Sequence, residues 1–412
     1  MKIFQINSVC GVRSTGRIVA DIYTRLRAAG HDCIMAYGRD ESANCGGDAF
    51  KFNTRAGVYA DALLSRITGK AGCFSTHATK HLLSEIDRYN PDVVHLHNLH
   101  GYYVNAFMLV SELARRKKPV VWTLHDCWPF TGHCAYFDKY GCDKWKSLCR
   151  DCPAKHDYPK SLFFDASKEQ YEKKREIFTL PDNMTIVTPS KWLKNLVKQS
   201  FLSRYDAVVI NNGVNGDAFS IKARYAALPE YLNGSEYVLG VALPFGERKG
   251  FSDFMRLRKE LTDKYRIVMV GLSDKQIAAL PPGITGIRRT NNVHALAALY
   301  ANARCFVNLT QEDNFPTTNI ESLMCGTPVV TYDTGGSPES VFAGAGEAVK
   351  KGDVTRVARI LENICPGDAD RQKIALEAAH RFGTDAMADK YVALYEEIAR
   401  RAVKTEICGG KQ

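Results

Sequence analysis

Residues 303–333 read ARCFVNLTQEDNFPTTNIESLMCGTPVVTYD and contain a complete unit of strand, loop, helix and strand. The two ends, ARCFVNLT and TPVVTYD, are short apolar runs of the kind that form buried strands. Pro316 suits the first turn of a helix, and Gly326 followed by Pro328 suits its end. We therefore predict a βαβ unit whose loop, QEDNF, lies at the carboxyl end of the first strand.

The same alternation of apolar run and amphipathic stretch extends over the rest of the chain. Strand-like runs are predicted at residues 2–9, 92–98, 119–126, 184–190, 206–213, 236–243, 265–271, 303–310 and 327–333. Such runs separated by helical spacing indicate parallel sheets built from βαβ units. Because there are two series of them, we predict an α/β protein with two doubly wound, Rossmann-like domains.

Composition along the chain suggests where these domains meet. We predict an N-terminal domain at residues 1–212, with a cysteine-rich insertion at 127–152. The segment 213–235 is rich in Gly, Asn, Pro and charge and is predicted to be a linker. A C-terminal domain at 236–384 follows, and the amphipathic stretch at 385–412 is predicted to be a helix that crosses back to the first domain, with a tail.

The bulk numbers are those of an ordinary globular protein, with 45% hydrophobic and 24% charged residues among 412. We find no secretory signal and no run of about 18 apolar residues, so we expect a cytoplasmic protein that does not span a membrane. Its thirteen cysteines are then expected to be reduced thiols or metal ligands. The net charge of +10 suits an anionic partner such as a nucleotide, nucleic acid or membrane surface, although taken by itself the charge is better explained by solubility.

The predicted helix after QEDNF has the features of an anion site. The backbone N–H groups of Thr317, Thr318 and Asn319 are free at the helix start, and helix N-termini favour phosphate. Asp313 and Glu321 flank them and could bind sugar hydroxyls at either end of a nucleotide sugar. The alternative is that Asp313 caps the helix and Glu321 makes a surface ion pair.

These motifs resemble those of a known family. D-x7-E followed by SLMCGTPVV resembles the E-x7-E motif of the family 4 retaining glycosyltransferases, whose GT-B architecture has two Rossmann-like domains with a cleft between them. The landmarks TPSKWL, VINNGVN, KGF, LYANARCFVNLT and GGSPE agree with that family over nearly the whole chain. WTLHD followed by a cysteine-rich stretch, residues 122–153, is similar to the branch of colanic-acid-type exopolysaccharide enzymes.

The resemblance implies transfer of a hexose, with retention, from a nucleotide-diphosphate sugar to a glycan or lipid-linked saccharide. It implies a UDP-sugar donor, with a GDP-sugar as the rival, and catalysis without a metal or other cofactor. Lys249 matches the lysine that contacts the diphosphate. The arginine expected beside it is replaced by Pro244, which leaves Arg248 as its substitute.

The resemblance also implies roles for the remaining candidates. Glu321 matches the acid that holds the ribose, and Asp313 matches the acid that holds the donor sugar, although the family has a longer Glu at that position. Pro316 begins the helix that faces the diphosphate, and His125 matches the residue of the first domain that faces the donor sugar.

The loop GVRSTG, from Gly11 to Gly16, follows the first strand and lacks the GxGxxG fingerprint of dinucleotide enzymes. It allows an acceptor or phosphate to approach the backbone, or it is a plain turn between strand and helix.

Four cysteines, Cys134, Cys142, Cys149 and Cys152, have the spacing C-x7-C-x6-C-x2-C. They fit either a closed structural zinc site or a set of unrelated reduced thiols.

From Asn183 to Tyr205 there is no acid, and an apolar stripe opposes several lysines. This pattern predicts a core-packed helix with a solvated basic face. That face could still contact the inner surface of the plasma membrane, where lipid-linked acceptors reside.

Three other functions compete with the transferase. One is a GT-B nucleotide-sugar epimerase, and another is a degenerate transferase that only binds sugars. The third, a zinc-stapled nucleic-acid-binding protein, is disfavoured because no basic patch is concentrated in the sequence, so we expect no nucleic acid partner.

Overall fold

The computed structural model describes residues 1–40, 42, 46–232 and 234–409. The chain forms two compact units. The first contains Met1–Asn211 together with the chain from Met387 onward, and the second contains Asn212–Ala386. Each unit has its own sheet and its own hydrophobic cores, so each is described separately below.

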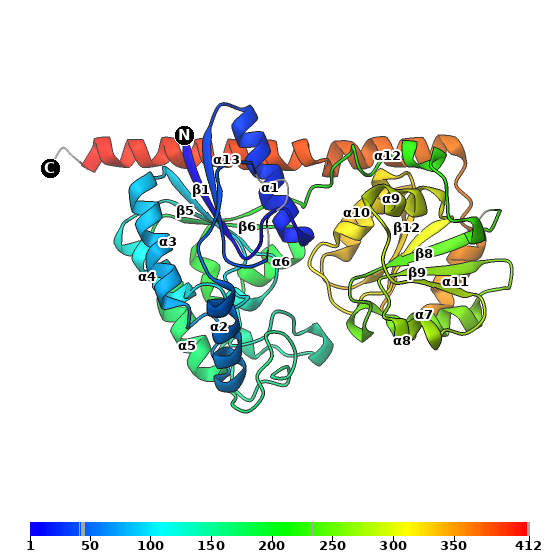
Figure 1. Ribbon diagram of the computed structural model, residues 1–412, viewed down its shortest axis with the longest axis horizontal. Helices are drawn as coiled ribbons and strands as arrows, with labels where there is room; N and C mark the ends of the chain where they lie inside the picture. Colours follow the sequence, from blue (N-terminus) through cyan, green and yellow to red (C-terminus); the bar gives the residue numbers. More distant parts are fainter. Residues whose placement is uncertain (41, 43–45, 233, 410–412) are drawn as a thin grey trace. The chain divides into compact units, whose positions relative to one another are not determined.

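The first unit is built on a parallel seven-stranded sheet in the order β3-β2-β1-β4-β5-β6-β7 (Figure 1). Its strands are β1 (Lys2–Asn7), β2 (Asp32–Tyr37), β3 (Ala49–Lys51), β4 (Val93–Leu96), β5 (Val120–Thr123), β6 (Met184–Thr188) and β7 (Ala207–Val209). The central strands β4 and β5 are buried along their whole length, which explains their continuous apolar sequence.

Helices cover both faces of this sheet. They are α1 (Arg13–Ala28), α2 (Arg55–Thr68), α3 (Thr76–Tyr89), α4 (Ala106–Arg115), α5 (Ser167–Ile177), α6 (Lys191–Val197) and α13 (Thr384–Gly409). Side chains of α1 and α13 pack in one core, and side chains of α3, α4 and α6 pack in the other. The core of α3, α4 and α6 also contains much of the cysteine-rich segment.

The second unit has a parallel six-stranded sheet in the order β10-β9-β8-β11-β12-β13. Its strands are β8 (Tyr237–Val241), β9 (Arg266–Val270), β10 (Ile284–Ile287), β11 (Cys305–Asn308), β12 (Val329–Asp333) and β13 (Gly346–Lys350). Its helices are α7 (Phe251–Glu260), α8 (Asp274–Ala278), α9 (Val293–Asn302), α10 (Thr317–Met324), α11 (Val354–Asn363) and α12 (Asp368–Phe382). As Figure 1 shows, α9, α10 and α12 lie over one face and α7, α8 and α11 over the other.

Both sheets are doubly wound, as predicted, and each therefore has a point where the strand order reverses. It lies between β1 and β4 in the first unit and between β8 and β11 in the second. Open α/β sheets bind ligands at the carboxyl ends of the strands that flank this point. The loops after these four strands are therefore the places to look for function.

Four strands were not predicted from the sequence: β2, β3, β10 and β13. Three of them, β3, β10 and β13, are edge strands with mixed burial, so their sequences lack a continuous apolar run. The segment 213–235 is also more than a linker, because Val214, Phe219 and Leu232 are buried in a core of the second unit.

The basic stretch from Asn183 to Tyr205 packs against the core, as its favoured interpretation predicted. Leu193 and Val197 are fully buried, and Trp192, Leu196 and Phe201 pack against the same core while keeping partial exposure. Within the described residues, no helix has both the length and the hydropathy needed to span a bilayer.

Candidate functional site

The helix α10 begins at the carboxyl end of β11, as the sequence predicted. Pro316 precedes the helix as its N-cap instead of lying in the first turn, and no side chain caps the helix. Asp313 is therefore not the capping residue. At the other end, Gly326 has φ of 76°, which is the left-handed conformation expected just after a helix.

Two of the three predicted backbone donors remain at the start of α10. The N–H group of Asn319 donates to the Pro316 carbonyl at 3.2 Å, so it is not free for a ligand. Its buried side chain bonds Asn308 and Ser340, at 2.8 and 2.9 Å. Asn319 therefore ties the helix to its sheet, and the prediction that it binds the donor is corrected. Among the described residues no acceptor contacts the N–H groups of Thr317 and Thr318, which are half-buried.

Beside this helix start, Lys249 and Asp313 form an ion pair between Nζ and Oδ2. Lys249 ends a short turn that follows β8, and Asp313 lies in the loop after β11. The pair therefore sits at the reversal point of the second sheet. Both side chains retain some exposure, 24% for Lys249 and 13% for Asp313, which leaves them accessible to a ligand.

Two glycines make this pairing possible. Gly250 has φ of 81°, and a Cβ there would lie 2.2 Å from the Leu309 carbonyl oxygen. Gly335 has φ of 57°, and a Cβ there would lie 1.8 Å from the Asp313 carbonyl oxygen. The backbone therefore approaches closely on both sides of the pair, and only glycine fits at either position.

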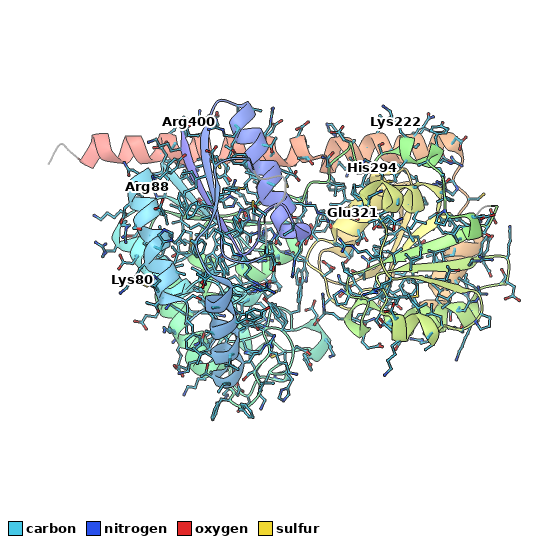
Figure 2. The ribbon with its side chains drawn as sticks, in the orientation of Figure 1. Lys80, Arg88, Lys222, His294, Glu321 and Arg400 are labelled. Carbon is cyan, nitrogen blue, oxygen red and sulfur yellow. The ribbon has the colours of Figure 1, made fainter. Side chains whose placement is uncertain are left out.

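Glu321 lies inside α10, and Figure 2 labels it on that helix. It is only 4% exposed, and its Oε2 accepts a hydrogen bond from the Tyr300 hydroxyl at 3.1 Å. The surface ion pair considered as an alternative is therefore excluded. A buried carboxylate held by a tyrosine suits a preorganised acceptor for hydroxyl groups.

Arg248 precedes Lys249 and joins the two loops. Its guanidinium donates to the Glu312 carbonyl at 3.1 Å, and its own carbonyl accepts from the Gln311 N–H at 2.8 Å. Arg248 therefore lies beside the candidate site even though it is four residues from the family position at Pro244.

In the first unit, the loop after β1 is shorter than predicted. The helix α1 begins at Arg13, so Gly16 lies inside the helix. The Gly11 N–H donates to the Gly16 carbonyl at 2.9 Å, and Gly11 has φ of 66°. The Gly11 N–H is therefore used within the fold, which weakens the case for it as a phosphate donor.

A row of three histidines lies in and just after β4 and after β5, with His95 inside β4. His125 lies two residues after β5, and its Nε2 is 3.1 Å from Nδ1 of His97. The ring of His97 in turn lies 3.9 Å from the ring of His95, measured between centroids. Burial lowers the pKa of His125 to about 4, and it lowers the pKa of His95 and His97 well below the ordinary value. All three imidazoles are therefore neutral near pH 7.

His95 anchors this row to the last helix. Its Nε2 is 2.8 Å from the Thr123 hydroxyl, and its Nδ1 is 2.6 Å from the Tyr395 hydroxyl. The Nε2 atom of His97 is buried, and no described residue hydrogen-bonds it. Sequence reasoning selected His125 alone, although the motif HLHNLH at 95–100 already carried the signal for a cluster.

A second pair lies next to His125. His100 Nε2 is 2.7 Å from Asp126 Oδ2, and the Trp128 N–H donates to Asp126 Oδ1 at 3.0 Å. Burial by itself raises the pKa of Asp126, but the charge and hydrogen bond of His100 outweigh it and lower the pKa. The Asp126 carboxylate therefore stays ionised beside a neutral His125.

The four predicted zinc ligands line a single small cavity. A thiol hydrogen bond links Cys134 and Cys152, and it raises the pKa of Cys134 and lowers that of Cys152. The Gly132 N–H donates to Cys149 Sγ at 3.2 Å. In the described part of the chain, however, no three His, Cys, Asp or Glu side chains stand ready to hold a metal. The zinc site therefore remains a prediction.

Two family models and a curated relative are similar to this chain. The model described as Glycosyltransferase Family 4 matches residues 15–217, and the model described as Glycosyl transferases group 1 matches residues 237–365. A relative named for colanic acid biosynthesis, the glycosyl transferase WcaC of Escherichia coli (strain K12), is 27% identical over 281 residues, which cover 66% of this chain and 67% of that protein.

Solved structures share the fold over nearly the full length. Sucrose-phosphate synthase from Thermosynechococcus elongatus has a TM-score of 0.68 at 16% identity, covering 97% of this chain and 99% of that one. HepE from Anabaena, solved in complex with UDP-glucose, has a TM-score of 0.63 at 13% identity, covering 96% of this chain and 100% of that one. At such identities the likeness concerns the fold alone.

Proposed function

The chain belongs to the family 4 glycosyltransferases of GT-B fold, and we propose that it moves a hexose from a nucleotide-diphosphate sugar to a saccharide acceptor, with retention at the anomeric carbon. The observation that carries this proposal is the charged site at the reversal point of the second sheet. There a lysine, a carboxylate and two unused helix N–H groups lie together.

The charges of this site suit a diphosphate leaving group. As the bond to the sugar breaks, negative charge grows on the departing phosphate. We propose that Lys249 neutralises that charge, together with the Thr317 and Thr318 N–H groups at the positive end of α10. Arg248 is placed to add a second positive charge, and these groups supply the stabilisation without a metal ion.

Two carboxylates would orient the donor. Glu321, fixed by Tyr300, would accept hydrogen bonds from the ribose hydroxyls. Asp313 would hold a hydroxyl of the hexose, and its contact with Lys249 keeps it in position. The base is proposed to be uracil, with guanine as the rival, and HepE bound to UDP-glucose supports the first choice.

The first unit would supply neutral hydrogen-bonding groups. With its pKa lowered to about 4, His125 is an unprotonated imidazole that can donate or accept a hydrogen bond to a sugar hydroxyl without adding charge. We propose that it contacts the donor hexose and that His97 fixes its tautomer through the hydrogen bond between their rings.

The acceptor is proposed to be a glycan or a lipid-linked saccharide of surface or exopolysaccharide synthesis. The relationship to WcaC, named for colanic acid biosynthesis, supports this class. Such acceptors are made at the inner face of the plasma membrane, so we propose a cytoplasmic enzyme with peripheral contact to that face.

A thermal-shift titration tests the donor first. The protein is titrated with UDP, GDP, ADP and CMP, and then with the sugar conjugates of the best binder. We expect one nucleoside diphosphate to raise the melting temperature and Glu321→Gln to abolish the shift. If no nucleotide raises the melting temperature, the transferase proposal is replaced by that of a degenerate transferase that only binds sugars. Conversion of the nucleotide sugar without any acceptor would indicate an epimerase instead.

A further inference from the structure

The fully buried side chains of α2 are polar, and several of its large apolar side chains are exposed. Its buried side chains are Asp61 and Ser65, and the Asp61 carboxylate accepts hydrogen bonds from two serine hydroxyls at 2.9 and 2.6 Å. Its exposed side chains include Tyr59, Leu63 and Leu64, which are 62%, 59% and 43% accessible. A surface helix ordinarily buries its apolar side. The outer face of α2 is therefore available to an external partner.

A second apolar segment lies against the end of this helix. The Leu162 N–H donates to the Arg66 carbonyl at 2.7 Å, which fixes the segment to the last turn of α2. Within the segment, the Ser161 hydroxyl donates to the Phe164 carbonyl at 2.6 Å. Leu162, Phe163 and Phe164 are nonetheless 43%, 66% and 63% exposed. Hydrogen bonds therefore fix the backbone of this segment, while the rings of Phe163 and Phe164 stay exposed.

Together these residues form one exposed apolar region. We call it the α2 surface, and it consists of Tyr59, Leu63, Leu64, Leu162, Phe163 and Phe164. In Figure 1, α2 and the loops that follow the cysteine-rich segment lie at the same end of the first unit. Single exposed apolar side chains are common, but six of them on one helix and on the segment bonded to its last turn are typical of an interaction site.

Basic side chains accompany the α2 surface. Arg55 lies over the ring of Tyr59, 5.9 Å from its centroid, and Arg66 and Lys160 are exposed beside the apolar residues. Arg66 also lies over the ring of Tyr102, 5.9 Å from its centroid, but none of the three forms an ion pair with an acid among the residues that the structure describes. A region that combines aromatic tips with unpaired positive charge is complementary to an anionic lipid surface.

We propose that the α2 surface docks on the face of an anionic bilayer. Its leucines and phenylalanines enter the interfacial region, and Arg55, Arg66 and Lys160 contact lipid phosphates. A second copy of the chain is the weaker candidate, because a symmetric dimer would bring the same basic side chains together. This inference extends the membrane contact of the proposed function, but vesicle binding without nucleotide tests it independently of sugar transfer.

The experiment is a vesicle flotation assay on the full chain. The vesicles contain phosphatidylglycerol and phosphatidylethanolamine, or phosphatidylcholine alone. We expect binding to the anionic vesicles only, and weaker binding at high salt. The double variant Phe163→Ser, Phe164→Ser should lower the partition coefficient at least tenfold. Arg66→Glu with Lys160→Glu should lower it by a similar factor on anionic vesicles.

Matched controls come from exposed residues outside the α2 surface. Leu376→Ser removes a 73% exposed leucine from α12 in the second unit. Lys80→Glu reverses an exposed charge on α3 of the first unit, where Figure 2 labels it. Neither control should change binding, and melting curves verify that all variants fold. The proposal is overturned if the wild-type chain ignores anionic vesicles, or if Leu376→Ser weakens binding as much as the phenylalanine pair. If the wild-type chain forms a dimer, the Phe163→Ser, Phe164→Ser variant is a monomer, and neither binds vesicles, then the α2 surface serves self-association instead.

Discussion

In the second unit, the loops after β8 and β11 bring a lysine and a carboxylate into contact, whereas in the first unit two neutral imidazoles, His97 and His125, meet after β4 and β5, next to the pair formed by His100 and Asp126. Both regions lie at the carboxyl edge of a doubly wound parallel sheet. In the first unit His95 and His97 are buried and their rings pack closely, while His125, like the ion pair of the second unit, keeps some exposure. The same topology thus places an ion pair at one sheet edge and a neutral imidazole pair at the other, and the proposed division of roles between phosphate and sugar hydroxyls rests on that contrast.

The largest effect should follow from removing the charges of the second unit. We expect Lys249→Ala and Glu321→Gln each to lower kcat/KM for sugar transfer by about 100- to 1000-fold, the usual range for losing one group that stabilises developing charge. Glu321→Gln keeps an oxygen for the Tyr300 hydroxyl, so the fold should survive. The control is Lys351→Ala, an exposed lysine of the same unit. Near-normal transfer by both site variants would contradict the assignment.

A steric change should test whether the backbone around Asp313 matters. Gly335→Ala drives a Cβ against the Asp313 carbonyl oxygen, and we expect a loss of about 2 kcal/mol in stability together with weaker nucleotide binding. Gly344 is the matched control, because it also has positive φ, 80°, but a Cβ there meets nothing within 4 Å. Calorimetry and thermal unfolding measure both properties. Equal nucleotide affinity in the two variants would separate Gly335 from the site.

The histidines of the first unit should affect turnover without affecting the nucleotide. We expect His125→Ala to lower kcat about 10- to 100-fold, as loss of a positioned hydrogen-bonding group does, and His97→Gln to lower it less. The affinity for the nucleoside diphosphate, measured by calorimetry, should stay unchanged in both. A parallel fall in nucleotide affinity would mean that the division of labour between the two units is wrong.

Acid should destabilise the first unit selectively. The histidines with lowered pKa, His95, His97, His125 and His133, all lie there. The unfolded chain binds these protons near pH 6.5 and the folded chain only near pH 4 or below, so stability is lost as pH falls between those values. At pH 5.5 the loss is about 1 kcal/mol for each such histidine.

The chain provides its own probe for this prediction. All four tryptophans lie in the first unit, so tryptophan fluorescence follows that unit alone. Urea unfolding at pH 7 and pH 5.5 should show a lower midpoint at the lower pH. Replacing His133 with Gln should reduce the difference, and an unchanged midpoint in the wild-type chain would contradict the neutral state of these histidines.

The smallest effect concerns the cysteine cavity. The spacing of its four thiols predicts about one zinc per chain, which elemental analysis measures directly. Removal of the metal with a chelator should lower the tryptophan-detected midpoint of the first unit, since Trp145 lines the same cavity. A metal-free protein that is folded and active would end the zinc prediction and leave reduced thiols.

Much of the fold follows from local pattern. The runs that became β4, β5, β11 and β12 are mostly apolar because those strands lie inside their sheets, and this property can be recognised in the sequence. Edge strands such as β13 are partly exposed and carry no such signal. The helix start at Thr317 was equally legible, because a proline before it and a glycine after it bound the element.

The candidate site was only partly predictable. Asp313, Glu321 and Lys249 were found through a motif, but the same reasoning included Asn319, whose side chain turned out to join a helix to its strand. His97 was missed because nothing in its local sequence states which ring it will meet. The role of a polar residue depends on its neighbours in space, and those are set by strand order.

The sequence by itself determined two doubly wound sheets and the strand, loop and helix unit that contains α10. The tertiary structure alone decided that Lys249 meets Asp313, 64 residues away, and that three histidines lose their protons. It also decided that α2 faces its leucines outward. The reason is physical. Backbone propensity and periodicity depend on neighbours in sequence, whereas the desolvation and ion pairing of a side chain depend on all the atoms that the fold places around it.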